Sequence, residues 1–449
     1  MYMNEPELIV LSKEEESSLQ EEAYILLDNL IKTNPLCIMQ PKFEEVSNDY
    51  ILNVLNEQLN DLVIDKNLCN IIAKAKSKYY KLVMPPRSYK DTFIRNHYDK
   101  EKMRVKLEYI KNIPQPAQRT TEWYEFRYEH LTASSAWKAF STQSAQNQLI
   151  YGKCCPLDTA KYTTCNINTP MHHGNKYEPL SLMYYEQTYN THVSDFGCIP
   201  HFTHKFLAAS PDGINTDITS GLYGRMLEVK NIVNREINGI PKIEYWIQMQ
   251  LQMEACDLNE CDFLETQFVE YKSKEEFDGD GTFTHTEDNK LKGIIMYFSE
   301  NDNPLYEYCP LSVNSDEFEI WEKEMHKKHE DKLWMKNLYW RLDIISCVLV
   351  LRNKLWFKHG LPILESLWNT ILSEKDGDYS HRAPKKKAKS GPFAEFKSSK
   401  CYINLLTPKT KSGPFSGFKS SKCYISLPTT NAIPKSSIKK QVTNINVNT

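Results

Sequence analysis

Hydrophobic positions in the first 112 residues recur at the spacing of amphipathic helices. The apolar positions of the first such helix are Ala23, Leu26, Leu27 and Leu30. Ser12 is followed three residues later by Glu15, which is the pattern of a capping box and predicts where this helix begins. Pro114 and Pro116 then interrupt the helical pattern. We therefore expect a helical N-terminal region over residues 1–116.

From Thr120 to about Cys309 the pattern changes to short β-rich runs that alternate with helical segments. The expected strands are residues 192–199, 205–209, 225–230, 261–271 and 293–298. The expected helices are residues 134–140, 175–189 and 243–255. This alternation is typical of an α/β domain with a central sheet flanked by helices. We place that domain at residues 117–310.

Residues 314–372 return to helical character, so we expect a helical C-terminal region over residues 311–380. Its five tryptophans are expected to pack in the core rather than bind a ligand: Trp321, Trp334, Trp340, Trp356 and Trp368. The longest apolar run, Ile344–Leu351, is far shorter than a membrane span. The N-terminus lacks the pattern of a signal peptide. The expectation is an intracellular protein without membrane association, whose 12 cysteines are reduced thiols.

The segment 381–449 is basic and contains a duplicated motif. KSGPFAEFKSSKCYINL begins at Lys389 and KSGPFSGFKSSKCYISL begins at Lys411. The apolar positions that the copies share are Phe393, Phe396, Tyr402, Ile403, Phe415, Phe418, Tyr424 and Ile425. Such a disordered tail predicts bivalent docking on a partner, with neutral duplication as the alternative. Pro384–Lys389 (PKKKAK) fits a nuclear-import signal or plain solubilising charge.

The net charge of −3 is the sum of unlike parts. From Arg382 onwards, 14 Lys and Arg stand against one acidic residue, so this tail carries +13 and the preceding residues carry −16. Residues 1–65 hold 3 basic and 14 acidic residues, whereas residues 66–111 hold 13 basic and 4 acidic ones. Aromatic residues interleave the basic stretch, which is typical of a nucleic-acid face. A solvated helical face with its aromatic residues in the core fits equally well.

Two short segments carry the candidate chemistry. Ser210-Pro211-Asp212-Gly213 is followed, fifteen residues after the aspartate, by Leu227-Glu228-Val229-Lys230. Alternation along a strand places Glu228 and Lys230 on one face, with the two apolar residues on the other. An aspartate at the end of a neighbouring strand could then share a divalent ion with Glu228, and carboxylate oxygens suit Mg²⁺ or Mn²⁺.

The Glu-x-Lys pattern by itself is weak, because the chain contains it four times, beginning at Glu228, Glu270, Glu330 and Glu395. Only the first copy lies on an apolar strand with a Ser-Pro-Asp-Gly turn upstream. For the other three, a surface salt bridge is the better interpretation.

Three further motifs stand around this pair in a recognisable order. The first motif consists of Trp123, Arg127 and the run Leu131–Ser134. The second consists of Gly174, Tyr177 and Glu178, and the last consists of Tyr245, Gln248 and Gln250. With the Asp and Glu-x-Lys motifs, they resemble the PD-(D/E)XK nuclease superfamily, in the branch of lambda exonuclease and the YqaJ-like viral recombinases, or alkaline exonucleases, that large DNA viruses carry. The resemblance covers about residues 118–270. It implies a restriction-endonuclease-like core.

The resemblance also implies roles for particular residues. Asp212 and Glu228 would be metal ligands, with Glu178 as a third acid. Lys230 would be the catalytic lysine, and Gln248 would support the substrate or the attacking water. Arg127 and Ser134 would grip the 5′-terminal phosphate, with Ser210 as a weaker candidate. The residues themselves support this phosphate site, because Ser134 falls where a helix should begin and a guanidinium can clamp a phosphate. An N-cap and a surface ion pair are the alternatives for Ser134 and Arg127.

The implied activity is that of a Mg²⁺- or Mn²⁺-dependent exodeoxyribonuclease. It would degrade linear double-stranded DNA from 5′ to 3′ in viral recombination, repair or replication, as a homotrimer, with a strand-annealing protein as a partner. The alternatives are an endonuclease or RNA-degrading nuclease with the same metal site, and a non-cleaving DNA-binding scaffold. The expected location is the host nucleus or a cytoplasmic viral factory.

Two rival metal sites are weaker. Cys154, Cys155 and Cys165 with His172 or His173 could bind zinc, but their spacing matches no common zinc pattern. An iron–sulfur cluster at the later cysteines is not favoured, because they include no Cys-x2-Cys pair. Those later cysteines are Cys256, Cys261, Cys309 and Cys347.

Overall fold

The computed structural model describes residues 11–59, 65–95, 99–158, 167, 169–301 and 303–384. The chain divides into two compact units. The first holds residues 1–87, 353–362 and 382–449, and the second holds residues 88–352 and 363–381. Helix α12 (Lys354–Lys375) contributes to both units. The chain therefore passes from one unit to the other after residues 87, 352, 362 and 381.

The first unit is helical, as the hydrophobic pattern predicts. Its elements are α1 (Lys13–Thr33), the short 3-10 helix η1 (Cys37–Met39), α2 (Phe43–Leu59) and α3 (Asp65–Leu82). The capping box at the start of α1 is confirmed, because the Glu15 amide donates to Ser12 Oγ and Glu15 Oε2 accepts from the Ser12 amide. The predicted apolar stripe is buried in the core of the unit, at Ala23, Leu26, Leu27 and Leu30.

Several cations of the basic stretch 66–111 form ion pairs with acidic side chains. Lys76 is buried and pairs with Glu44 at 2.6 Å, and Tyr79 is buried beside it on α3. Five more of its cations form ion pairs: Lys78 with Glu21, Arg95 with Glu260, Lys102 with Asp99, Arg104 with Glu101 and Glu108, and Lys106 with Asp257. These contacts favour the solvated helical face for this stretch.

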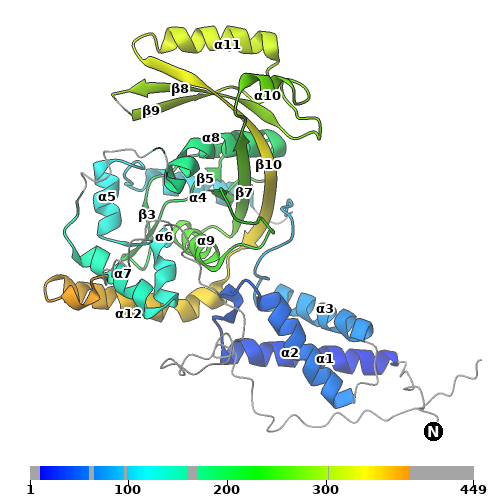
Figure 1. Cartoon of the computed structure of the whole chain (residues 1–449). Coiled ribbons are helices and arrows are strands. Elements are labelled where there is room, and N and C mark those ends of the chain that lie inside the picture. The colour runs from blue at the N-terminus through cyan, green and yellow to red at the C-terminus, as the bar shows by residue number, and fades with distance from the viewer. Residues whose placement is uncertain are drawn as a thin grey trace, which may run out of the picture. The chain divides into compact units, whose positions relative to one another are not determined.

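The second unit is built on a mixed seven-stranded sheet with the strand order β2-β5-β6-β7-β10-β8-β9. Its strands are β2 (Val193–Ser194), β5 (Gly213–Asn215), β6 (Met226–Asn231), β7 (Glu260–Glu270), β8 (Lys292–Glu300), β9 (Asn303–Tyr308) and β10 (Leu333–Leu351). The central strands β6 and β7 are parallel, and the other pairs are antiparallel. The expected α/β class, with a central sheet flanked by helices, is confirmed (Figure 1).

Two helices cover opposite faces of the central strands. Leu227 and Val229 of β6 pack beneath Tyr185 of helix α8 (Pro170–Tyr189). Because side chains alternate along a strand, Glu228 and Lys230 project from the other face, toward helix α9 (Ile243–Cys256). The hydrophobic pattern thereby fixes which face of β6 carries the charged residues.

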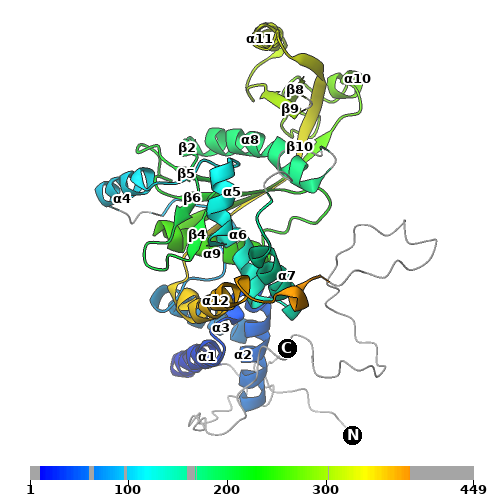
Figure 2. The same ribbon diagram turned by 90° about the vertical axis from the view of Figure 1, so that its left-hand side faces the viewer.

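Shorter helices and a small sheet complete the second unit. The helices are α4 (Lys100–Asn112), α5 (Thr121–Tyr128), α6 (Ala133–Ala136), the 3-10 helix η2 (Trp137–Phe140) and α7 (Gln143–Cys154). The small sheet has the order β1-β4-β3, with β1 (Leu131–Thr132), β4 (Leu207–Ala209) and β3 (Ile199–Pro200). The strand expected over residues 192–199 is therefore wrong, because its ends belong to two different sheets. Figure 2 shows α5 between α8 and α6.

The expectation of a wholly helical region after residue 310 is wrong. Helices α11 (Ser315–Lys328) and α12 are present, but the residues between them form the 19-residue strand β10, which pairs with both β7 and β8. Leu338, Trp340 and Leu342 alternate along β10 and enter the core beneath α8, which is the pattern of a strand. The first half of β10 extends with β8, β9, α10 (Lys274–Asp278) and α11 beyond the central strands (Figure 1).

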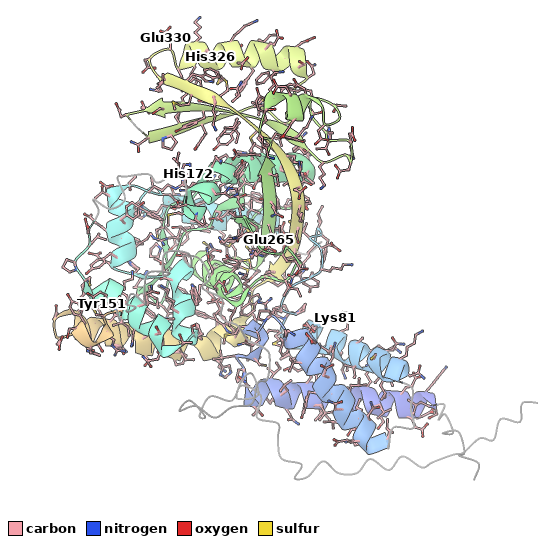
Figure 3. All side chains as sticks on the ribbon, in the orientation of Figure 1. Lys81, Tyr151, His172, Glu265, His326 and Glu330 are labelled. Atoms are coloured by element: carbon pink, nitrogen blue, oxygen red, sulfur yellow. The ribbon has the colours of Figure 1, made fainter. Side chains whose placement is uncertain are left out.

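Most of the five tryptophans pack as expected. Trp340 and Trp356 are fully buried, Trp321 packs on Phe318, and Trp368 stacks on Phe206. Trp334 is the exception, since it is 44% exposed and contacts His326 of α11, which Figure 3 labels. No helix in the described ranges is both long and apolar enough to cross a membrane. The duplicated motif and residues 385–389 of the import-like run lie outside the described residues.

Candidate active site

The charged face of β6 forms the centre of the site. Glu228 is fully buried, and the Lys230 ammonium contacts its Oε1. The same ammonium lies 4.0 Å from Oδ2 of Asp212. The aspartate, the glutamate and the lysine predicted from two separate segments are therefore in one place.

The Asp212 turn is tied to both neighbouring elements. Asp212 Oδ2 accepts a hydrogen bond from the Val229 amide at 2.8 Å, which anchors the turn to β6. The side-chain amide of Gln118 donates to the carbonyl oxygen of Pro211 at 3.3 Å, which links the turn to the segment before α5. The turn therefore holds its carboxylate against the strand that carries Glu228.

Glu178 is the third acid of this site. It lies on α8, and its Oε2 is 3.3 Å from Nη2 of Arg119. Burial and the charge of Asp212 raise the pKa of Glu178 to about 7, although Arg119 and Lys230 oppose the shift. Asp212 repels Glu178 and Glu228 alike, so we call Glu178, Asp212 and Glu228 the acidic cluster.

The two charges on β6 shift each other's pKa. Burial and then the charge of Asp212 raise the pKa of Glu228 to about 7, against the opposing effect of Lys230. Burial would lower the pKa of Lys230, but the carboxylates of Glu228 and Asp212 outweigh it and raise that pKa above its ordinary value. The ring of Tyr245 lies 5.3 Å from the ammonium and covers it from α9.

The acidic cluster has the carboxylate ligands of a divalent-cation site, but the described side chains are not arranged around a cation. Across the described ranges, no group of three or more His, Cys, Asp or Glu side chains is arranged to hold a metal ion. The Lys230 ammonium instead occupies the position beside Glu228 and Asp212 and neutralises part of their charge. Carboxylate oxygens are the ligands of Mg²⁺ and Mn²⁺, and a cation there would relieve the repulsion that raises both glutamate pKa values.

The glutamine that contacts the acidic cluster is Gln252, which the sequence motif did not include, and the substrate-supporting role of Gln248 stays a prediction. Gln252 is fully buried, and its Nε2 donates to Glu228 Oε2 at 2.7 Å and to the Ser210 carbonyl oxygen at 3.1 Å. Gln250 donates instead to the carbonyl oxygen of Leu351 at 3.0 Å. The predicted Gln248 lies one helical turn before Gln252, so both share a face of α9. That spacing was the signal in the sequence that could have identified Gln252.

A fourth carboxylate, which the sequence motifs do not include, lies on the same face of the sheet. Glu265 of β7 pairs in register with Lys230 of β6, so both side chains project toward α9 (Figure 3 labels Glu265). The side chain is almost fully buried, and Arg235 contacts its Oε1. Burial raises the pKa of Glu265 against the effect of Arg235. Glu265 Oε2 is buried and has no hydrogen-bond partner among the described residues.

The residues predicted for the 5′-phosphate also meet. Arg127 Nη2 donates to Ser134 Oγ at 2.9 Å, and the guanidinium lies 4.2 Å from the centre of the Trp123 ring. The Trp123 ring nitrogen in turn donates to Ser210 Oγ at 3.2 Å. Helix α6 begins at Ala133, so Ser134 lies in its first turn as expected. We call Arg127, Ser134 and Ser210 the phosphate pocket.

Lys153 supports the phosphate pocket from α7. Its ammonium donates to the carbonyl oxygens of Arg127, Tyr128 and His130, where α5 ends. Burial, followed by the charge of Arg127, lowers the pKa of Lys153 to about 7. The amine therefore fixes the backbone that carries Arg127 and does not itself point into the pocket.

The described members of the rival zinc site have other partners. Cys154 donates to the Ile371 carbonyl oxygen, and Cys155 shares a side-chain hydrogen bond with Tyr151. His172 shares a hydrogen bond with the Tyr306 hydroxyl, and His173 packs on the Tyr177 ring. Cys165 lies outside the described residues. The four cysteines weighed for an iron–sulfur cluster are separate free thiols.

Comparison with known families agrees with this site. Residues 122–259 match the family model described as the YqaJ-like viral recombinase domain. The resemblance to this family is confirmed. The YqaJ-like domain contains the acidic cluster, Lys230, Gln252 and the phosphate pocket, whereas Arg119 precedes it.

The individual relatives share 30% or less of their sequence with this chain. Uncharacterized protein R354 of Acanthamoeba polyphaga mimivirus is 30% identical over 367 residues, which are 70% of this chain and 65% of that protein. The chain thus spans about 65% of the length of that relative. Two crystal structures of LHK-Exo, an alkaline exonuclease from Laribacter hongkongensis, are 18% identical to the chain. The complex with dAMP covers 57% of this chain and 95% of its own with a TM-score of 0.33, and the other covers 59% and 97% with a TM-score of 0.34.

Proposed function

We propose that the chain is a divalent-metal-dependent nuclease of the PD-(D/E)XK type that hydrolyses the phosphodiester backbone of DNA. The observation that carries the proposal is the meeting of the acidic cluster with Lys230 inside the YqaJ-like domain. A purely DNA-binding scaffold would not require the fully buried Glu228 beside a second carboxylate that repels it, because burial of charge is costly.

In this proposal the acidic cluster holds Mg²⁺ or Mn²⁺ through Asp212 and Glu228, with Glu178 as a third ligand. Such an ion would supply charge neutralisation at the scissile phosphate and would activate a water for attack. Gln252 holds Glu228 in its orientation through the bond to Oε2. Lys230, displaced from its place between the carboxylates, orients the nucleophile and stabilises negative charge on the phosphate.

The phosphate pocket supports exonuclease polarity. An arginine stacked on an indole and two serine hydroxyls suit a terminal phosphate dianion. We therefore propose 5′-to-3′ degradation of linear duplex DNA in viral recombination, repair or replication. The product would be a 3′ overhang for a strand-annealing partner.

The test is a cleavage time course on linear duplex DNA with either a 5′-phosphate or a 5′-hydroxyl, in Mg²⁺ and in EDTA. Lys230→Ala should abolish cleavage and leave DNA binding largely intact. Lys272→Ala is the matched control, because Lys272 is the exposed lysine of another Glu-x-Lys sequence, that of Glu270. Equal loss of activity in both variants, or an undiminished rate in Lys230→Ala, would overturn the mechanism.

Other substrates separate the rival activities. Closed circular DNA and structured RNA should resist cleavage if the proposal holds. Cleavage of the circle would indicate an endonuclease, and faster cleavage of RNA would indicate an RNA-degrading nuclease with the same metal site.

A further inference from the structure

Arg119 has a backbone conformation that its side chain does not favour. Its φ of 68° lies in the left-handed region, which residues other than Gly, Asn and Asp rarely adopt. Two neighbours hold it there. The side-chain amide of Gln118 donates to the carbonyl oxygens of Phe196 and Pro211, and the Thr120 hydroxyl caps α5 by accepting from the Trp123 backbone amide. The position of Arg119 is therefore fixed from both sides, against the local preference of the chain.

The observed contacts of the Arg119 side chain do not explain this conformation. Nη2 lies 3.3 Å from Glu178 Oε2 and 3.3 Å from Asn175 Oδ1, both on α8. The side chain is nevertheless 53% exposed. An ion pair that is so exposed contributes little to stability, because water and salt screen it. Stabilisation of the fold is thus an inadequate reason for a strained arginine at this point.

The location of Arg119 supplies a better reason. Trp123 and Arg127 are four residues apart and lie on one side of α5, and Arg119 directly precedes the Thr120 cap of that helix. Trp123 links this segment to the phosphate pocket, since Arg127 stacks on its ring and Ser210 accepts from its ring nitrogen. At the other end of the segment, the Arg119 guanidinium contacts Glu178 of the acidic cluster. The segment 119–128 therefore presents one guanidinium to each of the two parts of the site, Arg127 from α5 and Arg119 from the residue before its cap.

We propose that Arg119 binds the phosphodiester that enters the acidic cluster, while Arg127 holds the terminal phosphate. This inference rests on the proposed function and adds a substrate-binding residue to it. In the DNA-free protein Arg119 pairs with Glu178, and in the complex it exchanges this carboxylate for a phosphate oxygen. The exchange leaves Glu178 available to a cation at the moment that the substrate arrives. A planar guanidinium suits this task because it can bind two phosphate oxygens at once.

Arg119→Gly separates this role from a structural one. Glycine favours a positive φ, so the variant should unfold at a temperature equal to or above that of the wild type. The single-turnover cleavage rate should nevertheless fall by about 100-fold, since the removed group stabilises charge at the phosphate. Arg119→Lys retains the positive charge but not the planar guanidinium, so its single-turnover rate should lie between those of the wild type and Arg119→Gly. Arg104→Ala is the control, because Arg104 is a surface arginine paired with Glu101 and Glu108.

A binding measurement tests the contact without cleavage. Duplexes that carry a single uncharged methylphosphonate at the first phosphodiester are compared with unmodified duplexes in EDTA. The neutral linkage should weaken binding to the wild type about tenfold and should not weaken binding to Arg119→Gly further. An equal effect on both proteins, or cleavage by Arg119→Gly within twofold of the wild type, overturns the assignment of Arg119. Absence of cleavage by the wild type would instead refute the proposed function, and the binding comparison would still decide the role of Arg119.

Discussion

Gln252 joins the acidic cluster to the rest of the core. Its Nε2 donates to Glu228 Oε2 at 2.7 Å and to the carbonyl oxygen of Ser210 at 3.1 Å, and both bonds are shielded from water. Gln252→Leu keeps a similar volume but removes the donor. The carboxylate of Glu228 then loses the hydrogen bond that fixes one of its two oxygens, while Lys230 still contacts the other.

The size of the effect follows from the charge of the acceptor. A hydrogen bond to a charged group contributes about 1.5–3 kcal/mol. If this energy is lost in the transition state, the single-turnover rate falls by roughly 10- to 100-fold, since about 1.4 kcal/mol corresponds to a factor of ten. The bond also lowers the pKa of Glu228, so its loss raises that pKa further above about 7. Because the ionised carboxylate is the form that binds a cation, the acidic limb of the pH–rate profile should move to higher pH by ~1 unit.

Gln250→Leu is the matched control for this prediction. Gln250 is as buried as Gln252 and lies two residues away on α9, but its side chain donates to the Leu351 carbonyl oxygen. Both variants should lose stability in chemical denaturation, whereas only Gln252→Leu should shift the pH–rate profile. Single-turnover rates over about pH 6–9 measure the difference. The same profile in both variants would refute the role given to Gln252.

Three further predictions follow from the same geometry. Arg127→Ala should reduce the preference for 5′-phosphorylated over 5′-hydroxyl ends by about 10- to 100-fold, as expected for a lost charged hydrogen bond; an unchanged preference would contradict the phosphate pocket. The two glutamates of the acidic cluster have pKa values of about 7 in the folded protein, above the ordinary value for glutamate. Their protonation therefore stabilises the metal-free fold below about pH 4.5, and this stability is lost as pH rises through 7. The rise in melting temperature with added Mg²⁺ should therefore be larger at about pH 8 than at pH 5, and equal shifts would argue against a carboxylate site. Gly197→Ala should reduce the free energy of unfolding by about 1–3 kcal/mol in chemical denaturation, because the new Cβ would lie 2.2 Å from the Pro116 carbonyl oxygen; Gly152→Ala, which meets open space, should show no such loss.

The fold was predictable where the hydrophobic pattern is regular, and was not where tertiary contacts decide. The stripe on α1 and the alternation on β6 each specify an element and its buried face. The strand β10 was read as helix because its 19 residues exceed an ordinary strand and their charges are sparse. Its conformation depends on β7 and β8, which are distant in sequence and supply its hydrogen bonds.

The site was predictable where one strand carries two of its groups. Glu228 and Lys230 share a face of β6 by alternation, and the resemblance supplied Asp212 and Glu178 from separate elements. Gln252 was missed because three glutamines alternate along α9, and only the packing of the helix shows which one reaches Glu228. Arg119 was missed for a different reason, since its importance lies in a backbone angle that the local sequence does not favour.

The charge distribution links these residues to the substrate. Residues 1–381 carry −16, so DNA meets net repulsion over most of the described protein. Within the site, the Lys230 ammonium pairs with Glu228, and the Lys153 ammonium donates to three carbonyl oxygens. In the proposed complex Arg119, after exchanging Glu178 for phosphate, and Arg127 would be the guanidiniums at the two ends of the bound strand. A site of this kind gains its phosphate affinity from the placement of two guanidiniums rather than from a broad positive field. The loss of either guanidinium should therefore alter the position of the bound DNA more than the affinity for DNA.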